Sequence, residues 1–166
     1  MEGLSTLVQI SSNVGHQSTK IMNVFIVGSP IETAMALDPK RLHKQVVECK
    51  QILSALKGET KAWRNHPCVI QYEGHEQWLM LYMECLSAWI EGGKQKALIA
   101  SVKASTFWTP LFHTEPYFDS MKRRLYTKDP VYYAQWEKCG TDDVNWYWSP
   151  SEDTYIYYKN GKRIEL

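Results

Sequence analysis

Glu48 is the single acidic residue of the stretch 40–53, where it lies among basic side chains. These are Lys40, Arg41, His43, Lys44 and Lys50. A carboxylate that neighbouring cations keep ionised can stabilise a developing positive charge or take part in general acid–base catalysis. The i,i+4 spacing of Lys44 and Glu48 also fits an ordinary surface ion pair, which would stabilise a helix by only about 0.2–0.5 kcal/mol. The spacing alone leaves both interpretations open.

A second basic cluster lies within residues 121–128. It contains Lys122, Arg123, Arg124 and Lys128, with aromatic residues nearby at Tyr117, Phe118 and Tyr126. Basic side chains interleaved with aromatic rings suit a phosphate backbone with an unstacked base. A solvated helix face is the alternative interpretation. Because the net charge is only +1, any binding of nucleic acid must depend on local clusters of this kind.

The histidines and cysteines do not predict a metal site or a disulfide framework. His66 and His75 are nine residues apart on one expected helix, but no third ligand accompanies them. The four cysteines lack metal-binding or disulfide spacing, which indicates a reducing, cytoplasmic compartment. No apolar run approaches the length of a membrane span. We therefore expect no metal, no cofactor and no membrane partner.

The element that positions Glu48 is a long helix expected over residues 39–57. Asp38 provides its N-terminal cap, Pro39 fits its first turn, and Gly58 ends it. Apolar side chains recur along it at helical spacing, at Leu42, Val46, Cys49, Leu53 and Leu56. At about 100° per residue, Glu48 lies about 120° from this stripe. We therefore place its carboxylate at the boundary between core and solvent.

The remaining elements predict a mostly α fold. Further helices are expected over 65–91, 94–105, 114–128 and 129–139, and the first of these is apolar nearly all round, although Gly74 interrupts it early. An apolar extended run precedes them at 23–30, and Asn-Gly near the end of the chain is a hairpin signal. We predict a compact bundle of about four to five helices around a central apolar helix. A short extended N-terminal segment and an aromatic C-terminal tail or small ribbon complete it.

Residues 22–166 are expected to form a single helical domain. Residues 1–21 are polar and Ser-rich and lack the pattern of a signal peptide. We expect them to be an N-terminal extension that is disordered or not native. Met22 is a second possible start, and the apolar extended run follows it at once.

Three stretches of the chain resemble one known family. In the long helix, Arg41 lies seven residues before Glu48. The stretch HPCVIQYEGHEQWLMLY (66–82) has a Pro and a Gly-His pair at matching separation, and the tail DTYIYYKNGK (153–162) is rich in tyrosine. Over about residues 22–162 the sequence resembles the pyrimidine dimer DNA glycosylases, small all-α repair enzymes also called endonuclease V in phage.

The resemblance implies that Glu48 is the catalytic acid. Enzymes of this family use an α-amino group at the start of the chain as a nucleophile on C1′ of a damaged nucleotide. The base leaves, an imine forms on the deoxyribose, and β-elimination of the strand follows. In this sequence the amine would belong to Met22, if the chain starts there, or to a nearby lysine.

The same resemblance implies a DNA-binding surface and a partner. Its expected residues are Arg41, His43, Lys44, Gln51, His75, Lys122, Arg123, Arg124, Lys128, Tyr157 and Tyr158. Val47 and Gln51 stand where the family has arginines, which weakens the expected grip on phosphate. The expected partner is double-stranded DNA with a damaged or flipped nucleotide, bound by a monomer without a cofactor.

Two other function classes fit the same residues. The chain could be a DNA-binding relative without glycosylase chemistry. It could also be a helical protein-interaction module that uses its aromatic tail as the contact surface. Covalent trapping on DNA and the salt dependence of DNA binding distinguish these classes from the enzyme.

Overall fold

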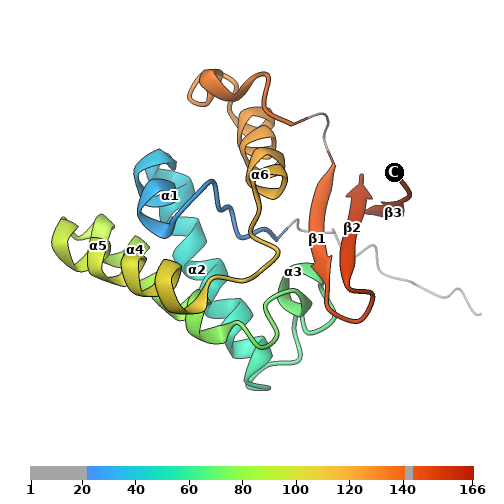
Figure 1. Cartoon of the computed structure of the whole chain (residues 1–166), viewed down its shortest axis with the longest axis horizontal. Helices are drawn as coiled ribbons and strands as arrows, with labels where there is room; N and C mark the ends of the chain where they lie inside the picture. The colour runs from blue at the N-terminus through green and yellow to red at the C-terminus, as the bar shows by residue number, and fades with distance from the viewer. Residues whose placement is uncertain (1–21, 141–143) are drawn as a thin grey trace, which may run out of the picture.

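The computed structural model describes residues 22–140 and 144–166, and this part of the chain is mostly α-helical (Figure 1). The helices are α1 (Pro30–Ala36), α2 (Pro39–Leu56), α3 (Pro67–Ile70), α4 (Glu76–Ile90), α5 (Lys94–Lys103) and α6 (Glu115–Lys128). A π-helical turn (Ala104–Trp108) continues α5, and a 3-10 turn (Ala134–Trp136) follows α6. The predicted fold class is confirmed. The predicted extension, residues 1–21, lies outside the described residues.

Helix α2 begins and ends as its local sequence predicts. The Asp38 side chain accepts a hydrogen bond from the backbone N–H of Arg41, and Pro39 occupies the first turn. The predicted apolar stripe is only partly right, because Val46 is half-buried whereas Gln45 and Glu48 are buried. The buried face of α2 is therefore wider than the stripe, and Glu48 belongs to it.

Helices α3 and α4 correct the prediction of one continuous helix over 65–91. The backbone of Gly74 adopts φ +81°, a left-handed conformation that favours glycine, and α4 begins two residues later. His66 caps α3, because its side chain accepts a hydrogen bond from the backbone N–H of Cys68. His66 and His75 consequently do not share a helix.

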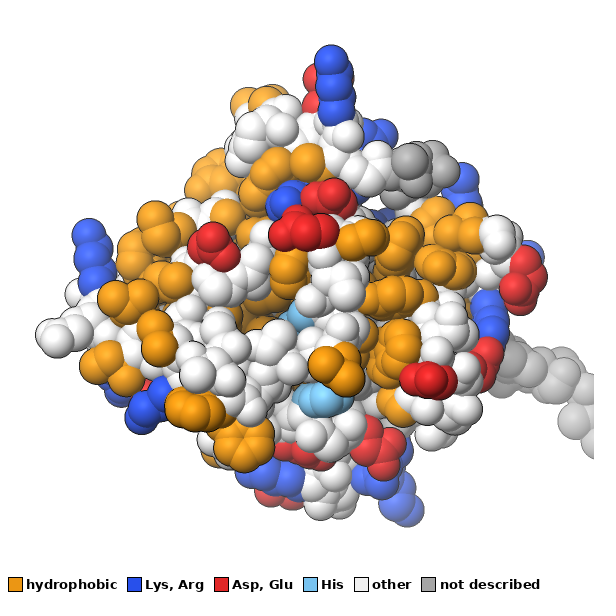
Figure 2. Space-filling model, in the orientation of Figure 1, with side chains coloured by type: hydrophobic (Ala, Val, Ile, Leu, Met, Phe, Trp, Pro, Cys, Tyr) orange, Lys and Arg blue, Asp and Glu red, His pale blue; other side chains and the backbone are white. Residues whose placement is uncertain are grey.

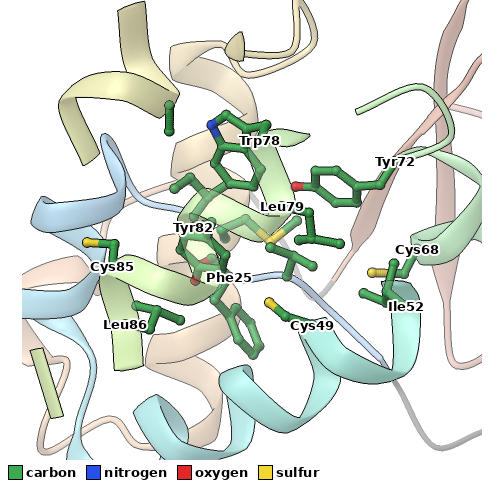
Figure 3. Close-up of a cluster of buried hydrophobic side chains, with 14 of the residues drawn as sticks. Phe25, Cys49, Ile52, Cys68, Tyr72, Trp78, Leu79, Tyr82, Cys85 and Leu86 are labelled. Carbon is green, nitrogen blue, oxygen red and sulfur yellow. The ribbon is translucent and has the colours of Figure 1, made fainter. Parts of the chain in front are cut away.

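Helix α4 supplies the centre of the core. Its buried side chains face α2 on one side, and α4 also packs against α1 and α5. Figure 3 shows Tyr82 and Leu86 of α4 pointing toward Phe25 and toward Cys49 of α2. The central apolar helix of the prediction is thus present, shortened at its N-terminal end.

The extended segment 22–27 crosses the molecule from the sheet to α1 (Figure 1). Its residues are buried up to Ile26, and it forms no strand. Side chains of the helices replace a strand partner: the backbone N–H of Phe25 donates to Gln45 Oε1 at 2.9 Å, and that of Val27 donates to Thr33 Oγ1 at 3.1 Å. The segment is therefore held by α2 and α1.

The C-terminal region forms a three-stranded antiparallel sheet in the order β1-β2-β3. The strands are β1 (Asn145–Ser149), β2 (Thr154–Lys159) and β3 (Lys162–Ile164). The predicted hairpin is confirmed between β2 and β3, where Asn160 and Gly161 both have positive φ, 51° and 73°. Strand β1 packs against α3 and α6 and so joins the sheet to the helices.

The predicted helix over 129–139 is wrong. This segment forms turns and the short 3-10 turn, because the Asp129 side chain caps the backbone N–H of Tyr132 and the chain then turns inward at Tyr133. The Tyr133 ring is buried and stacks on Trp136 at 5.2 Å between centroids. Tertiary packing of one tyrosine therefore overrides the helical pattern.

Tyr133 and Asp38 form a buried polar pair at the start of α2. The Tyr133 hydroxyl donates to Asp38 Oδ2 at 2.6 Å and accepts from the Asp38 backbone N–H at 2.9 Å. Burial raises the pKa of Asp38, but hydrogen bonds from Tyr133 and Arg41 more than offset it, so this pKa lies below its ordinary value. A depressed carboxyl pKa stabilises the fold above the unfolded pKa, about 4, and this stabilisation is lost as the pH falls through the folded pKa.

We expect Tyr133→Phe to lower the free energy of unfolding at pH 7 by about 1–3 kcal/mol, because Asp38 loses a buried hydrogen bond. The loss should be smaller at a pH below the folded pKa of Asp38, which itself lies below the ordinary value, because the carboxyl is then protonated in both states. Urea denaturation at pH 7 and at this low pH measures both effects. Tyr132→Phe, at the exposed neighbouring position, is the matched control and should change neither value. Equal losses at both pH values would contradict the role of the Asp38 carboxylate.

Apolar side chains also remain on the surface of the described residues. Leu98, Ile99 and Val102 are about half exposed on α5, and Phe107 is 72 % exposed in the π-helical turn. Figure 2 shows hydrophobic side chains over the α5 end of this face. None of the helices in 22–140 and 144–166 is both long and apolar enough to cross a membrane.

Candidate active site

The carboxylate of Glu48 is buried in the middle of α2, with the residue only 7 % exposed. Its Oε2 accepts a hydrogen bond from Gln45 Nε2 at 2.9 Å, and its Oε1 lies 3.5 Å from Lys44 Nζ. The Lys44–Glu48 ion pair is therefore present, but the acid is not on the open surface. A buried carboxylate is costly unless donors and cations compensate it, so this acid is held in place by its neighbours.

Gln45 fixes the backbone of the extended segment beside Glu48. The same Nε2 that donates to Glu48 also donates to the carbonyl oxygen of Asn23 at 2.7 Å. Its Oε1 accepts from the backbone N–H of Phe25 and from the Tyr82 hydroxyl, at 2.9 and 3.2 Å. One fully buried amide thus joins the carboxylate to residues 23–25.

The sheet holds the start of this segment from the other side. Met22 is 3 % exposed, and its carbonyl oxygen accepts a hydrogen bond from the Tyr147 hydroxyl at 3.2 Å. Asn23 Nδ2 donates to Asn145 Oδ1 at 3.1 Å. Since Tyr147 and Asn145 both belong to β1, the backbone at 22–23 lies between the sheet and the Glu48 face of α2.

A pocket of about 140 Å³ adjoins this arrangement on the α2 surface. It is lined by Phe25, Lys40, Arg41, Lys44, Gln45 and Lys128. Four of these six side chains are cations, and the lining also includes the amide that binds Glu48. A pocket of this size and charge suits a phosphate group or a sugar oxygen better than a whole nucleotide.

Helix α6 brings two of its basic residues to the region of Glu48 and the pocket. Arg124 is buried, and Lys128, one turn further along, lines the pocket. Partial burial lowers the pKa of Lys128, the positive charges of Arg124, Lys44 and Arg41 lower it further, and the negative charge of Glu48 acts in the opposite direction. The structure thus brings Arg41, Lys44, Arg124 and Lys128 together around Glu48.

The other two basic residues of α6 have different neighbours. Lys122 Nζ pairs with Asp119 Oδ1 at 3.1 Å. Arg123 donates to the backbone carbonyl of Glu137, and its guanidinium lies over the Tyr126 ring at 5.2 Å. The predicted basic cluster is therefore divided between two faces of α6, and one half borders the pocket.

Three predicted residues on the first helices and loops lie outside the pocket. His43 is exposed, with Nδ1 2.7 Å from the carbonyl oxygen of Pro39. Gln51 lines a separate pocket of about 390 Å³ that includes Trp63. His75 contacts the Phe112 ring at 5.7 Å, and none of the contacts among the described residues brings His75 to the cations around Glu48.

The two predicted tyrosines lie on β2. The Tyr158 ring contacts Tyr147 at 5.8 Å between centroids, and so reaches the side chain that holds the carbonyl of Met22. The Tyr157 ring contacts Trp146 at 5.2 Å. Tyr158 is thus one side chain removed from the site, and Tyr157 lies on the other side of the strand.

Two residues that organise the site, Gln45 and Tyr147, are not among the predicted site residues. Gln45 lies three residues before Glu48 and seven before Ile52, and all three are buried, so this helical spacing could have marked a second inward row on α2. The position of Tyr147 depends on the fold of the sheet against α3 and α6, and no local signal in the sequence indicates it.

A comparison with known protein families finds a match in the region of the chain that contains Glu48. Residues 22–90, somewhat less than half of the chain, match a family model described as pyrimidine dimer DNA glycosylase. The matched stretch includes the extended segment, Gln45, Glu48 and α4. No curated protein and no solved structure matches the chain.

Proposed function

We propose that this chain, whose residues 22–90 carry the pattern of the pyrimidine dimer DNA glycosylase family, is a DNA repair glycosylase with abasic-site lyase activity. The observation that carries the proposal is the buried carboxylate of Glu48, which Gln45 holds beside the backbone of residues 23–25. A buried acid at the edge of a cationic pocket can act on a substrate that is itself an anion.

Glu48 has two roles in the proposed reaction. An amine attacks C1′ of the damaged nucleotide, and the sugar acquires positive character as the bond to the base lengthens. A preorganised carboxylate stabilises this charge, and it can also accept a proton from the attacking nitrogen. The resulting imine allows a proton to leave C2′ and the 3′ phosphate to be eliminated. The amine is that of Met22, in a chain that starts there, or of a lysine near Glu48.

The cations around Glu48 bind the DNA backbone in this proposal. Arg41 is fixed by Asp38, with Nη1 2.8 Å from Oδ2, so it presents an ordered guanidinium. Together with Lys44 and Lys128 it makes one basic surface formed by α2 and α6, and the buried Arg124 adds positive charge nearby. The outlying residues extend this contact: His43, Gln51, His75, Lys122, Arg123, Tyr157 and Tyr158.

The proposed substrate is double-stranded DNA with a pyrimidine dimer, from which a nucleotide is flipped to expose C1′. We propose that residues 22–166 act as one domain, as a cytoplasmic monomer and without a cofactor. In the part of the chain that the structure describes, no group of three or more His, Cys, Asp or Glu side chains is placed to hold a metal ion.

A single experiment tests this function. The full chain is incubated with a duplex that contains one thymine dimer, and with the same duplex undamaged. We expect cleavage of the glycosidic bond to the damaged base, strand cleavage, and a covalent adduct when borohydride is added, all confined to the damaged duplex. With about four phosphate contacts, affinity should fall on the order of 100-fold between about 50 and about 200 mM salt.

The alternatives give different results in the same experiment. Salt-dependent binding without base release or adduct would indicate a DNA-binding relative that lacks the chemistry. Absence of any duplex binding would contradict the proposal altogether and favour a helical protein-interaction module.

A further inference from the structure

Lys128 has surroundings that differ from those of an ordinary surface cation. It lines the pocket with Arg41, Lys44 and Gln45, and its Nζ lies 5.9 Å from the centre of the Phe25 ring. None of the ion pairs among the described residues includes Lys128. Its amine therefore faces the pocket without a carboxylate partner there.

The charges around Lys128 favour the neutral amine. Partial burial is the largest cause that lowers the pKa of Lys128, and the positive charges of Arg124, Lys44 and Arg41 lower it further. The residue as a whole is exposed. Crowding by other cations and removal from water are the two standard ways to make a lysine nucleophilic near neutral pH. The negative charge of Glu48 acts in the opposite direction and is the smallest of the causes.

The other amines of the pocket are less suited to attack. Lys44 is already engaged by Glu48, at 3.5 Å. Met22 does not line the pocket: it is 3 % exposed, and its carbonyl oxygen accepts a hydrogen bond from the Tyr147 hydroxyl. Lys40 also lines the pocket without an ion pair among the described residues. Lys128 differs from it by lying over the Phe25 ring and by the nearby charges of Arg124, Lys44 and Arg41.

We propose that Nζ of Lys128 is the nucleophile that forms the covalent imine with C1′ of the damaged nucleotide. This inference rests on the proposed glycosylase function and names the amine that this function requires. It makes Lys128 a catalytic residue, and not solely a contact to the DNA backbone.

The step begins with the neutral amine of Lys128. The lone pair of Nζ forms a bond to C1′, and the bond between C1′ and the base breaks with its electron pair leaving on the base. Opening of the C1′–O4′ bond then gives the C1′=Nζ imine. The two protons that Nζ loses pass, by way of the Glu48 carboxylate or water, to the departing base and to O4′. Water later hydrolyses the imine and restores Lys128.

The test uses the full chain and three variants of it. Lys128→Arg keeps the positive charge and the phosphate contact but cannot form an imine with an aldehyde under these conditions. Lys128→Ala removes both. Lys138→Ala changes an exposed lysine in the turn beyond α6 and serves as the matched control. Each protein is mixed with duplex that carries one abasic site or one thymine dimer, and borohydride is added.

We expect the adduct to form with the unchanged chain and with Lys138→Ala, and to be lost in Lys128→Arg and Lys128→Ala. Peptide mapping should place the sugar remnant on Lys128. Lys128→Arg should still bind the duplex, and circular dichroism should confirm its fold.

An adduct on the terminal amine, on another lysine or at an unchanged level in Lys128→Arg would overturn the assignment of Lys128 and leave the glycosylase in place. Base release without any adduct would also overturn it, since the reaction would then proceed without an imine. Absence of both base release and adduct with the unchanged chain would overturn the proposed function and this inference together.

Discussion

Replacing Glu48 with Gln is expected to slow release of the damaged base by about 10²–10⁴-fold, because an amide can neither balance the developing positive charge nor accept a proton. The fold should survive, since the new side chain has the same shape and its carbonyl oxygen can still accept the hydrogen bond from Gln45 Nε2. Loss of the charge should leave Lys44 without its ion pair, which affects a half-exposed cation and costs little.

Single-turnover measurement of glycosidic-bond cleavage in a thymine-dimer duplex, followed by the strand break it produces, gives the size of this effect. Thermal unfolding followed by circular dichroism, at one pH and one salt concentration, verifies the fold. Glu84→Gln changes an exposed glutamate on α4 and is the matched control, with base release expected at the unchanged rate. A threefold difference in rate corresponds to about 0.65 kcal/mol in activation free energy. A Glu48→Gln rate within threefold of the control rate would rule out the proposed role of the carboxylate.

Replacing Gln45 with Met is expected to produce the largest loss of stability of any single polar substitution proposed for this chain. Methionine fills similar space but cannot form hydrogen bonds of this strength, so the Phe25 N–H, the Asn23 carbonyl and the Glu48 carboxylate each lose a buried partner. Each buried group left unsatisfied costs about 1–3 kcal/mol. We therefore expect the free energy of unfolding to fall by at least about 3 kcal/mol.

Denaturant unfolding measures this loss, and Gln77→Met, at an exposed position of α4, provides the comparison. The control should remain within about 0.5 kcal/mol of the unchanged chain. If Gln45→Met were to lose no more than the control, the hydrogen bonds of Gln45 would not be what holds the extended segment. Base release should fall in the same variant, because Glu48 and residues 23–25 lose their common support.

The parts of the fold that depend on local signals could be predicted from the sequence. Asp38 and Pro39 fix the start of α2 through backbone capping, and Asn160-Gly161 fixes the last hairpin through positive φ. These effects act within four residues of each other. Gly74 indicated an interruption in the sequence between α3 and α4. The length of the gap between the two helices depends on packing that a single residue does not specify.

The candidate site could be predicted only in part. Arg41, Lys44 and Glu48 share one helix, so their proximity follows from helical geometry alone. Arg124 and Lys128 come from a helix some eighty residues further along the chain, and only the tertiary fold brings them to α2. The burial of Glu48 has the same origin, because the segment at 22–27 covers a face of α2 that the apolar stripe does not include.

The attachment of the segment at 22–27 has a consequence for how the molecule opens. Its Phe25 and Val27 amides are bonded to side chains of α2 and α1, and none of the strands in the described residues pairs with it. A neighbouring strand could hold such a segment in place while a helix frays. Hydrogen bonds to helix side chains are lost when the helix that carries them moves. Release of the segment and hydration of the Glu48 carboxylate should therefore occur in one opening event, which makes the site and this part of the core a single cooperative unit.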